Sequence, residues 1–204
     1  VVKLFQFSHE EFTKCISCGH ISKSGSAQNE TIMRFACPEQ STPLHEYISE
    51  ILNGSTFREV WRCEDGCNKR NGGIHCTRIV DVSQVMFFTT IIDRVQQPRD
   101  GKKIIRDTKC PVTEDVTITD SQGLSAVFSP IAVIHHTGIV TKGNDTRGHY
   151  MADVRNAVTD EWFRTSDDQV PIQVHSPSDK CYITIYKKIT QAGTKGTLVT
   201  LKTK

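Results

Sequence analysis

The sequence predicts an α+β fold that is mostly β, with one short helix. The first observation is that short apolar segments recur along the chain between turn-forming glycines, prolines and asparagines. The second is that residues 43–52 carry apolar side chains at helical spacing. The third is that six of the eight cysteines lie in the first 80 residues. Together they predict a cysteine-rich subdomain over 1–82, a larger sheet over 83–189 and a peripheral tail over 190–204.

The helix is predicted to begin at Pro43, which suits a first helical turn, and to end before Gly54. Segment 60–76 is rich in glycine and is expected to be mostly loop, and 97–103 is expected to be a turn. The predicted strands are 2–7, 31–37, 78–82, 85–92, 104–106, 115–119, 126–134, 149–155, 160–164 and 181–188, with a further short strand possible at 198–201.

Composition and charge argue against two classes of partner. The net charge is +2 and the pI is 8.1, with Lys and Arg scattered along the chain, so we expect no nucleic-acid partner. No segment approaches the roughly 20 apolar residues of a membrane span, so we expect no membrane partner. Because clustered cysteines favour metal binding over disulfides, we expect an intracellular protein of the cytoplasm or nucleus.

Two close pairs of cysteines predict a structural zinc site. Cys15 and Cys18 are separated by two residues, and Cys63 and Cys67 by three, and each pair is accompanied by a glycine. Four such thiolates can surround one Zn²⁺ tetrahedrally, which leaves no open position for metal catalysis. The long insert between the pairs is expected to fold as strands that bring them together.

Three nearby residues are alternatives to one of these ligands. Cys76, or His75 beside it, could replace one of the four ligands. His20, which follows the first pair, is a weaker substitute.

The most specific pattern lies between residues 127 and 170. An apolar run leads into His-His-Thr-Gly at 135–138, Gly-His-Tyr follows at 148–150, and Trp162 precedes Ser-Asp-Asp-Gln-Val at 166–170. This pattern resembles the C-terminal histidine box of ubiquitin-specific proteases, which are UCH-type peptidases. The resemblance extends over about residues 3–189, because the cysteine pairs match the zinc-binding fingers of the family.

Two departures mark the chain as a divergent member of that family. Segment 82–95 lacks the proline that the family carries in the corresponding strand. Pro130 stands where the family usually has an apolar residue. The last strand, 181–188, keeps the alternation of the family's closing Ala-Tyr-x-Leu-x-Tyr pattern.

The resemblance implies a catalytic role for His149, as the base that draws the proton from a cysteine thiol. A third group should hold the imidazole by its other nitrogen. Counting forward from Trp162 and back from Val170 both give Ser166, and a shift of one residue gives Asp167. The count favours Ser166 and leaves Asp167 as the alternative.

The resemblance also places His136, Gly148 and Tyr150 in the substrate channel. Gly148 would leave room for a substrate backbone beside the histidine ring. An adjacent His pair, such as that at 135–136, is by itself more often structural. Segment 138–148 is implied to be a loop that moves when the ubiquitin tail binds.

The implied fold combines zinc-ribbon-like fingers with the antiparallel palm sheet of a papain-like cysteine protease, without its thumb. No cysteine of the sequence opens a helix behind an Asn-containing box, as the nucleophile of the family does. The nucleophile is therefore expected from a thumb segment outside this sequence or from a partner chain.

The implied function is that of the C-terminal part of a deubiquitinating cysteine protease, which hydrolyses (iso)peptide bonds after the ubiquitin Gly-Gly terminus. This part would supply the catalytic base and a ubiquitin-binding surface, and would be inactive alone. The alternative is a catalytically inactive module that binds ubiquitin or a ubiquitin-like protein.

Overall fold

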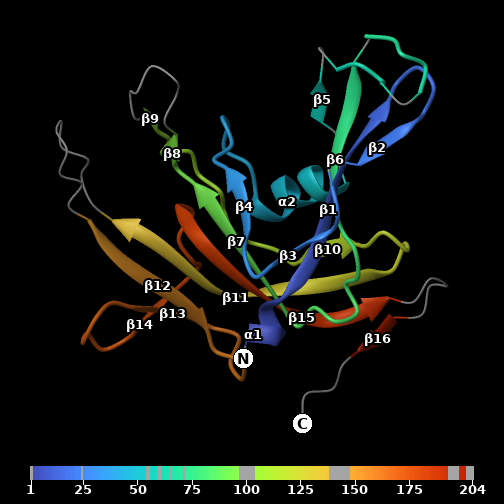
Figure 1. Cartoon of the computed structure of the whole chain (residues 1–204). Helices are drawn as coiled ribbons and strands as arrows, with labels where there is room; N and C mark the ends of the chain where they lie inside the picture. The colour runs from blue at the N-terminus through green and yellow to red at the C-terminus, as the bar shows by residue number, and fades with distance from the viewer. Residues whose placement is uncertain are drawn as a thin grey trace.

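The computed structural model describes residues 2–23, 25–53, 56–58, 61–64, 66–70, 72–96, 104–137, 148–192 and 198–200. Within them the chain forms two sheets, a two-stranded ribbon and two helices (Figure 1). The helices are α1 (Val2–Phe5) and α2 (Leu44–Asn53), and the ribbon pairs β8 (Val95–Gln96) with β9 (Ile104–Ile105). The fold is mostly β, as the sequence predicts.

The smaller sheet projects from the rest of the molecule in Figure 1. Its strands are β1 (Phe7–Cys15), β2 (Ile21–Lys23), β3 (Gln28–Glu30), β5 (Thr56–Arg58) and β6 (Gly73–Ile79). β1 pairs antiparallel with β6, from His9↔Ile79 to Cys15↔Gly73. This register brings the end of β1 beside the chain that leads into β6, and each of these segments carries one cysteine pair.

The larger sheet has the strand order β14-β13-β12-β11-β15-β7-β4, with β10 paired to β11 and β16 paired to β15. Its strands are β4 (Met33–Ala36), β7 (Phe87–Asp93), β10 (Val116–Thr119), β11 (Ser125–Thr137), β12 (His149–Arg155), β13 (Trp162–Thr165), β14 (Ile172–Val174), β15 (Cys181–Ala192) and β16 (Leu198–Thr200). The pairs are antiparallel as predicted, except that β4 runs parallel to β7.

One face of the larger sheet carries the core. Phe88, Phe128 and Tyr186 are at most 1% exposed, and the Phe88 ring lies 6.1 and 6.4 Å from the other two. Leu44 and Ile48 of α2 belong to the same cluster and are 0% exposed. Burial of each such side chain contributes about 1.5–3 kcal/mol. The packing confirms the predicted helix at 43–52.

The opposite side of the same strands, which we call the half-buried face, carries Ile134, Ile183 and Tyr150. Strand alternation puts these side chains together, and Tyr150 is 55% exposed. α1 lies at the start of β7, where Phe5 stacks on Phe87 with ring centroids 5.0 Å apart.

The strand predicted over 2–7 is wrong for its first part, because Val2–Phe5 forms a helical turn and β1 begins at Phe7. Packing of Phe5 on Phe87 overrides the local alternation. No strand is predicted over 8–15, yet β1 runs to Cys15. Its buried positions include the charged Glu10, so the segment lacks a clear apolar pattern.

Other boundaries also differ from the prediction. β6 begins at Gly73, inside the segment expected to be loop. β4 and α2 precede residue 82, yet they belong to the larger sheet and its core. The division of the chain into subdomains at residue 82 stays a prediction. Residues 97–103 and 138–147 lie outside the described residues. The possible strand at 198–201 is present as β16.

Candidate functional site

The structure brings the four predicted cysteine sulfurs together at the end of β1. The Sγ atoms of Cys15 and Cys67 are 3.8 Å apart, and those of Cys18 and Cys63 are 3.7 Å apart. All four lie within 4.8 Å of one another. Zn–S bonds of about 2.3 Å imply S···S distances of about 3.8 Å in a tetrahedron. The four sulfurs therefore fit a tetrahedral metal ion.

Tight turns aim the sulfurs at this common point. After Cys15, the Gly19 amide donates to the Cys15 carbonyl at 2.9 Å, and Gly19 has a φ of 72°. A Cβ on Gly66 would lie 2.6 Å from the Cys63 Sγ and 3.2 Å from the Cys18 Sγ. Glycine at position 66 is therefore needed because the sulfurs fill the space beside it.

The thiols of Cys18 and Cys63 differ in pKa because their surroundings differ. The backbone amide of His20 is the main cause that lowers the pKa of the Cys18 thiol to about 6. Loss of solvent contact raises the pKa of Cys63 to about 11. A metal ion binds thiolates, so the lowered pKa of Cys18 favours the form that binds a metal near neutral pH.

The alternative ligands lie outside this cluster. Among the described residues, the metal-competent group contains only the four cysteines. Cys76 lies in β6 with its Sγ 3.9 Å from the Ile74 carbonyl, and the His75 Nε2 lies 3.9 Å from a Glu11 carboxylate oxygen. His20 bonds to Cys15 through its backbone carbonyl, at 2.8 Å.

His149 opens β12 and meets the residues that follow β13. The pairing of Ala152 with Thr165 brings the two strand ends together. The His149 Nε2 lies 2.5 Å from the Ser166 Oγ and 3.5 Å from an Asp167 carboxylate oxygen. The structure thus brings His149 together with both predicted orienting residues.

Two features distinguish these orienting residues. Ser166 is closer and partly buried, whereas the Asp167 side chain is 78% exposed and its backbone φ is 44°. Both contact the same ring nitrogen, Nε2. The other nitrogen, Nδ1, is therefore the atom through which His149 can exchange a proton with a further group.

The three predicted channel residues form a second group. His136 and Tyr150 lie on the half-buried face with ring centroids 4.8 Å apart, and Tyr150 lies 5.8 Å from Tyr182. A Cβ on Gly148 would lie 1.7 Å from the His136 Nε2. Glycine at 148 therefore makes room for a ring of the protein itself.

A buried ionic network around Asp153, on the same strand as His149, was not predicted. Asp153 is 0% exposed and accepts hydrogen bonds from Arg164 Nε at 2.7 Å, Arg164 Nη2 at 3.1 Å and the Ser178 amide at 2.7 Å. The His135 Nδ1 lies 3.5 Å from the same carboxylate, and burial lowers the pKa of His135. The sequence carries no local signal for this network, because Asp153 alternates with other polar residues as a charge on a solvent-exposed face does.

The remaining buried cysteines lie around Arg94 in the core. Cys37, Cys110 and Cys181 are at most 3% exposed, and the Cys181 carbonyl accepts from Arg94 Nε at 3.0 Å. Burial raises the pKa of Cys37. Such enclosed thiols are poorly placed to meet a protein substrate.

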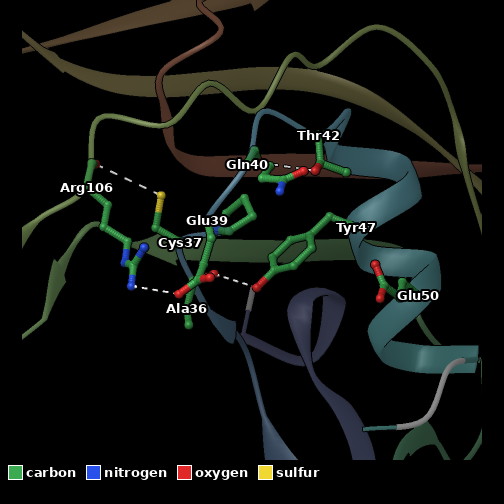
Figure 2. Close-up of a pocket in the computed structure, with 9 residues that line it drawn as sticks. Ala36, Cys37, Glu39, Gln40, Thr42, Tyr47, Glu50 and Arg106 are labelled. Carbon is green, nitrogen blue, oxygen red and sulfur yellow. Dashed lines mark hydrogen bonds and ion pairs between the residues drawn. The ribbon is translucent and has the colours of Figure 1, made fainter.

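A surface pocket of about 370 Å³ opens between α2 and the end of β4 (Figure 2). Tyr47 and Arg106 line it, and Arg106 pairs with Glu39 at 3.1 Å. The pocket contains none of the predicted site residues. Among the described residues, no helix is long and apolar enough to cross a membrane.

Four clustered cysteines in a finger-like sheet, and a histidine box in a larger palm-like sheet, define the class of ubiquitin-specific protease folds. A family model for ubiquitin carboxyl-terminal hydrolase matches residues 1–186, and the chain belongs to that family. A comparison with curated proteins found no match.

Solved structures share the fold at low sequence identity. Yeast SAGA DUBm with a mutant Sgf73 aligns with a TM-score of 0.72 and 16% identity, over 91% of this chain and 41% of that chain. The SAGA DUB module of Ubp8, Sgf11, Sus1 and Sgf73 bound to monoubiquitin aligns with a TM-score of 0.70 and 15% identity, over 91% and 41%. The module bound to ubiquitin aldehyde gives a TM-score of 0.69 and 14% identity, over 91% and 42%. The chain spans about two fifths of the length of these matched chains.

Proposed function

We propose that this chain forms the fingers and palm of a deubiquitinating cysteine protease. It supplies the catalytic base and a ubiquitin-binding surface, and it cleaves peptide or isopeptide bonds after the ubiquitin Gly-Gly terminus when a nucleophilic cysteine is present. The observation that carries this proposal is the 2.5 Å contact between the His149 Nε2 and the Ser166 Oγ. A ubiquitin-binding module without chemistry has no need for this pair.

The chemistry follows from the assignment of the two ring nitrogens. Nδ1 of His149 takes the proton of the incoming thiol, and the resulting thiolate attacks the carbonyl carbon of the scissile bond. The protonated ring then gives this proton to the leaving amine, which departs as the C–N bond breaks. In the second half, Nδ1 takes a proton from water as the water oxygen attacks the thioester, and returns it to the departing sulfur.

Ser166 is the proposed orienting group in this cycle, with Asp167 as the alternative. A hydrogen bond at Nε2 fixes the plane of the ring, so that Nδ1 faces the thiol. Serine orients the ring without adding a negative charge, whereas Asp167 would also stabilise the protonated imidazolium. The shorter contact and greater burial of Ser166 support serine.

The nucleophile is proposed to come from a thumb segment outside this sequence or from a partner chain. The half-buried face supports this, because it leaves the apolar residues Ile134, Ile183 and Tyr150 partly open to solvent. The matched chains are also more than twice as long as the aligned portion.

The cysteine cluster is proposed to hold Zn²⁺ through Cys15, Cys18, Cys63 and Cys67. A bound ion would supply structure, by joining the end of β1 to the chain before β6. All eight cysteines are free, which supports an intracellular location in the cytoplasm or nucleus.

His136, Gly148 and Tyr150 are proposed to line the channel for the ubiquitin tail. The exposed Tyr150 ring, held edge-on by His136, offers a flat apolar surface that suits a narrow glycine-containing chain. A catalytically inactive binder of ubiquitin or of a ubiquitin-like protein is the second candidate. It is favoured by the burial of the three core cysteines, Cys37, Cys110 and Cys181.

The test is to co-express the chain with a cysteine-bearing thumb segment of the same family and to supply ubiquitin with a C-terminal fluorogenic amide. We expect hydrolysis, and a loss of about 10²- to 10⁴-fold in kcat for His149→Ala, because the general base is removed. His175→Ala is the control, since this histidine lies outside the proposed site. Equal activity of His149→Ala and the unmodified chain would make the assignment wrong, and ubiquitin binding without hydrolysis would favour the second candidate.

A further inference from the structure

Asp153 is a fully buried carboxylate on the same side of β12 as His149. The two residues are four positions apart, so strand alternation puts their side chains on one face. Asp153 is 0% exposed, and it receives three hydrogen bonds of 2.7–3.1 Å from Arg164 and the Ser178 amide.

These contacts join four segments of the chain. Asp153 lies in β12, Arg164 in β13, His135 in β11, and Ser178 in the loop before β15. The Arg164 guanidinium meets the carboxylate with two parallel bonds, a geometry that fixes orientation as well as distance.

The position of β13 decides where Ser166 lies. Ser166 follows Arg164 by two residues, just after the end of β13, and its Oγ must lie within hydrogen-bond distance of the His149 Nε2. The β12–β13 pairing runs from Arg155↔Trp162 to Ala152↔Thr165, and the Asp153↔Arg164 pair lies inside it, next to the Ser166 end. The ion pair therefore ties β12 to β13 two residues before Ser166.

Stability alone does not account for a charge pair at this place. Replacing a buried ion pair by well-packed apolar residues is often neutral or stabilising, since desolvation offsets the attraction. The ion pair fixes orientation, which apolar packing does not. A guanidinium group donates two parallel hydrogen bonds to a carboxylate in only one relative arrangement.

We propose that Asp153 is a positioning residue for the His149–Ser166 pair, acting through Arg164. It holds β13 against β12 so that the Ser166 hydroxyl lies at the His149 Nε2. The importance of this placement for catalysis rests on the proposed function. The placement of Ser166 by Asp153 and Arg164 does not depend on it.

The experiment is NMR of the chain with ¹⁵N-labelled histidine, comparing Asp153→Asn with Ser166→Ala and with Glu10→Gln. Glu10 is a matched control, because its side chain is 10% exposed and it also binds two cations, Arg78 at 2.6 Å and Lys23 at 3.0 Å, in the smaller sheet. We expect Asp153→Asn to move the His149 Nε2 resonance in the same direction as Ser166→Ala. Glu10→Gln should leave this resonance in place while lowering Tm.

A lowered Tm for Asp153→Asn with an unmoved His149 resonance would overturn the proposal, since it would show a structural role alone. If Asp153→Asn does not fold, Arg164→Lys takes its place, because it keeps the charge and removes the fork. The same two outcomes then apply to Arg164→Lys.

This readout needs no nucleophile, so the two proposals can fail separately. A shifted resonance in a protein that never hydrolyses ubiquitin substrates would overturn the proposed function alone. Where hydrolysis is restored, we expect Asp153→Asn to lower kcat several-fold, by no more than Ser166→Ala does, with little change in KM, because displacing the orienting hydroxyl costs at most as much as removing it.

Discussion

The cysteine cluster and the His149 site are both built where a strand end meets a second segment, but they differ in completeness. The cluster has four sulfurs within 4.8 Å and needs only an ion. His149 has a hydroxyl at Nε2 and is 45% exposed, and in the proposed function its Nδ1 meets a group that comes from elsewhere. The difference teaches that the four ligands proposed for a metal come together inside the smaller sheet, whereas the catalytic role proposed for His149 depends on a second segment.

The largest effect that tests this contrast is expected from Cys63→Ser. The change removes one ligand from a site whose metal can contribute on the order of 10 kcal/mol to folding. We expect loss of about one zinc ion per chain and faster proteolysis near residues 61–70, with the larger sheet intact. Metal content and limited proteolysis measure both results.

Cys76→Ser is the matched control for that change. Cys76 lies in the same sheet but outside the sulfur cluster, so its variant should keep the metal. Loss of zinc in Cys76→Ser would break the contrast, because the cluster would then need a residue beyond the four cysteines.

The same contrast explains which features could be predicted from the sequence. Cys15 and Cys18 are near neighbours in the chain, so their spacing alone predicted half of the cluster. The histidine box likewise named His149 and Ser166 by counting along the chain. Asp153 and Arg164 escaped prediction because a charge that is buried by strand pairing looks, in sequence, like a charge on a solvent-exposed face.

Local patterns were also weaker than tertiary contacts at the start of the chain. Phe5 and Phe7 alternate as in a strand, but Phe5 stacks on Phe87 within a helical turn while Phe7 packs on Phe88. Which ring nitrogen of His149 meets Ser166 is also beyond the reach of sequence, because it depends on side-chain rotation.

A smaller effect is expected from filling the space beside each site. Gly66→Ala would push a methyl group to 2.6 Å from the Cys63 Sγ, and Gly148→Ala would push one to 1.7 Å from the His136 Nε2. Overpacking costs about 1–3 kcal/mol. We expect weaker zinc binding only in Gly66→Ala, and a changed His136 NMR signal only in Gly148→Ala.

Calorimetric zinc titration and histidine NMR of both variants measure these effects. Gly123→Ala is a control for the alanine substitution itself, since a Cβ there meets no atom within 4 Å, although its φ of 79° strains any side chain. If Gly148→Ala also weakened zinc binding, the two sites would be coupled and the contrast would fail.

Ser166→Ala and Asp167→Asn test which of the two residues orients the His149 ring. A neutral hydrogen bond contributes about 0.5–1.5 kcal/mol, so Ser166→Ala should lower kcat several-fold in the thumb-complemented enzyme. Asp167→Asn should change kcat less, because its side chain is 78% exposed and farther from Nε2. The reverse order of effects would assign the orienting role to Asp167.

The last test concerns the backbone that supports Cys18. The His20 amide lowers the pKa of Cys18 to about 6, so the thiolate form predominates above that pH and is lost as the pH falls through it. His20→Pro removes the amide hydrogen and should raise the pKa toward the ordinary value of 9.0, so that protons compete with the metal at higher pH. Each unit of this rise weakens metal binding near pH 7 by at most about tenfold.

His20→Ala is the control that gives this prediction its meaning. It keeps the backbone amide and the carbonyl that accepts from the Cys15 amide at 2.8 Å, and it removes only the imidazole. Zinc release measured against pH should therefore follow the unmodified chain in His20→Ala and move to higher pH in His20→Pro. If His20→Ala moved the curve as far as His20→Pro, the imidazole would be a ligand, and the cysteine site would no longer be complete in its four sulfurs.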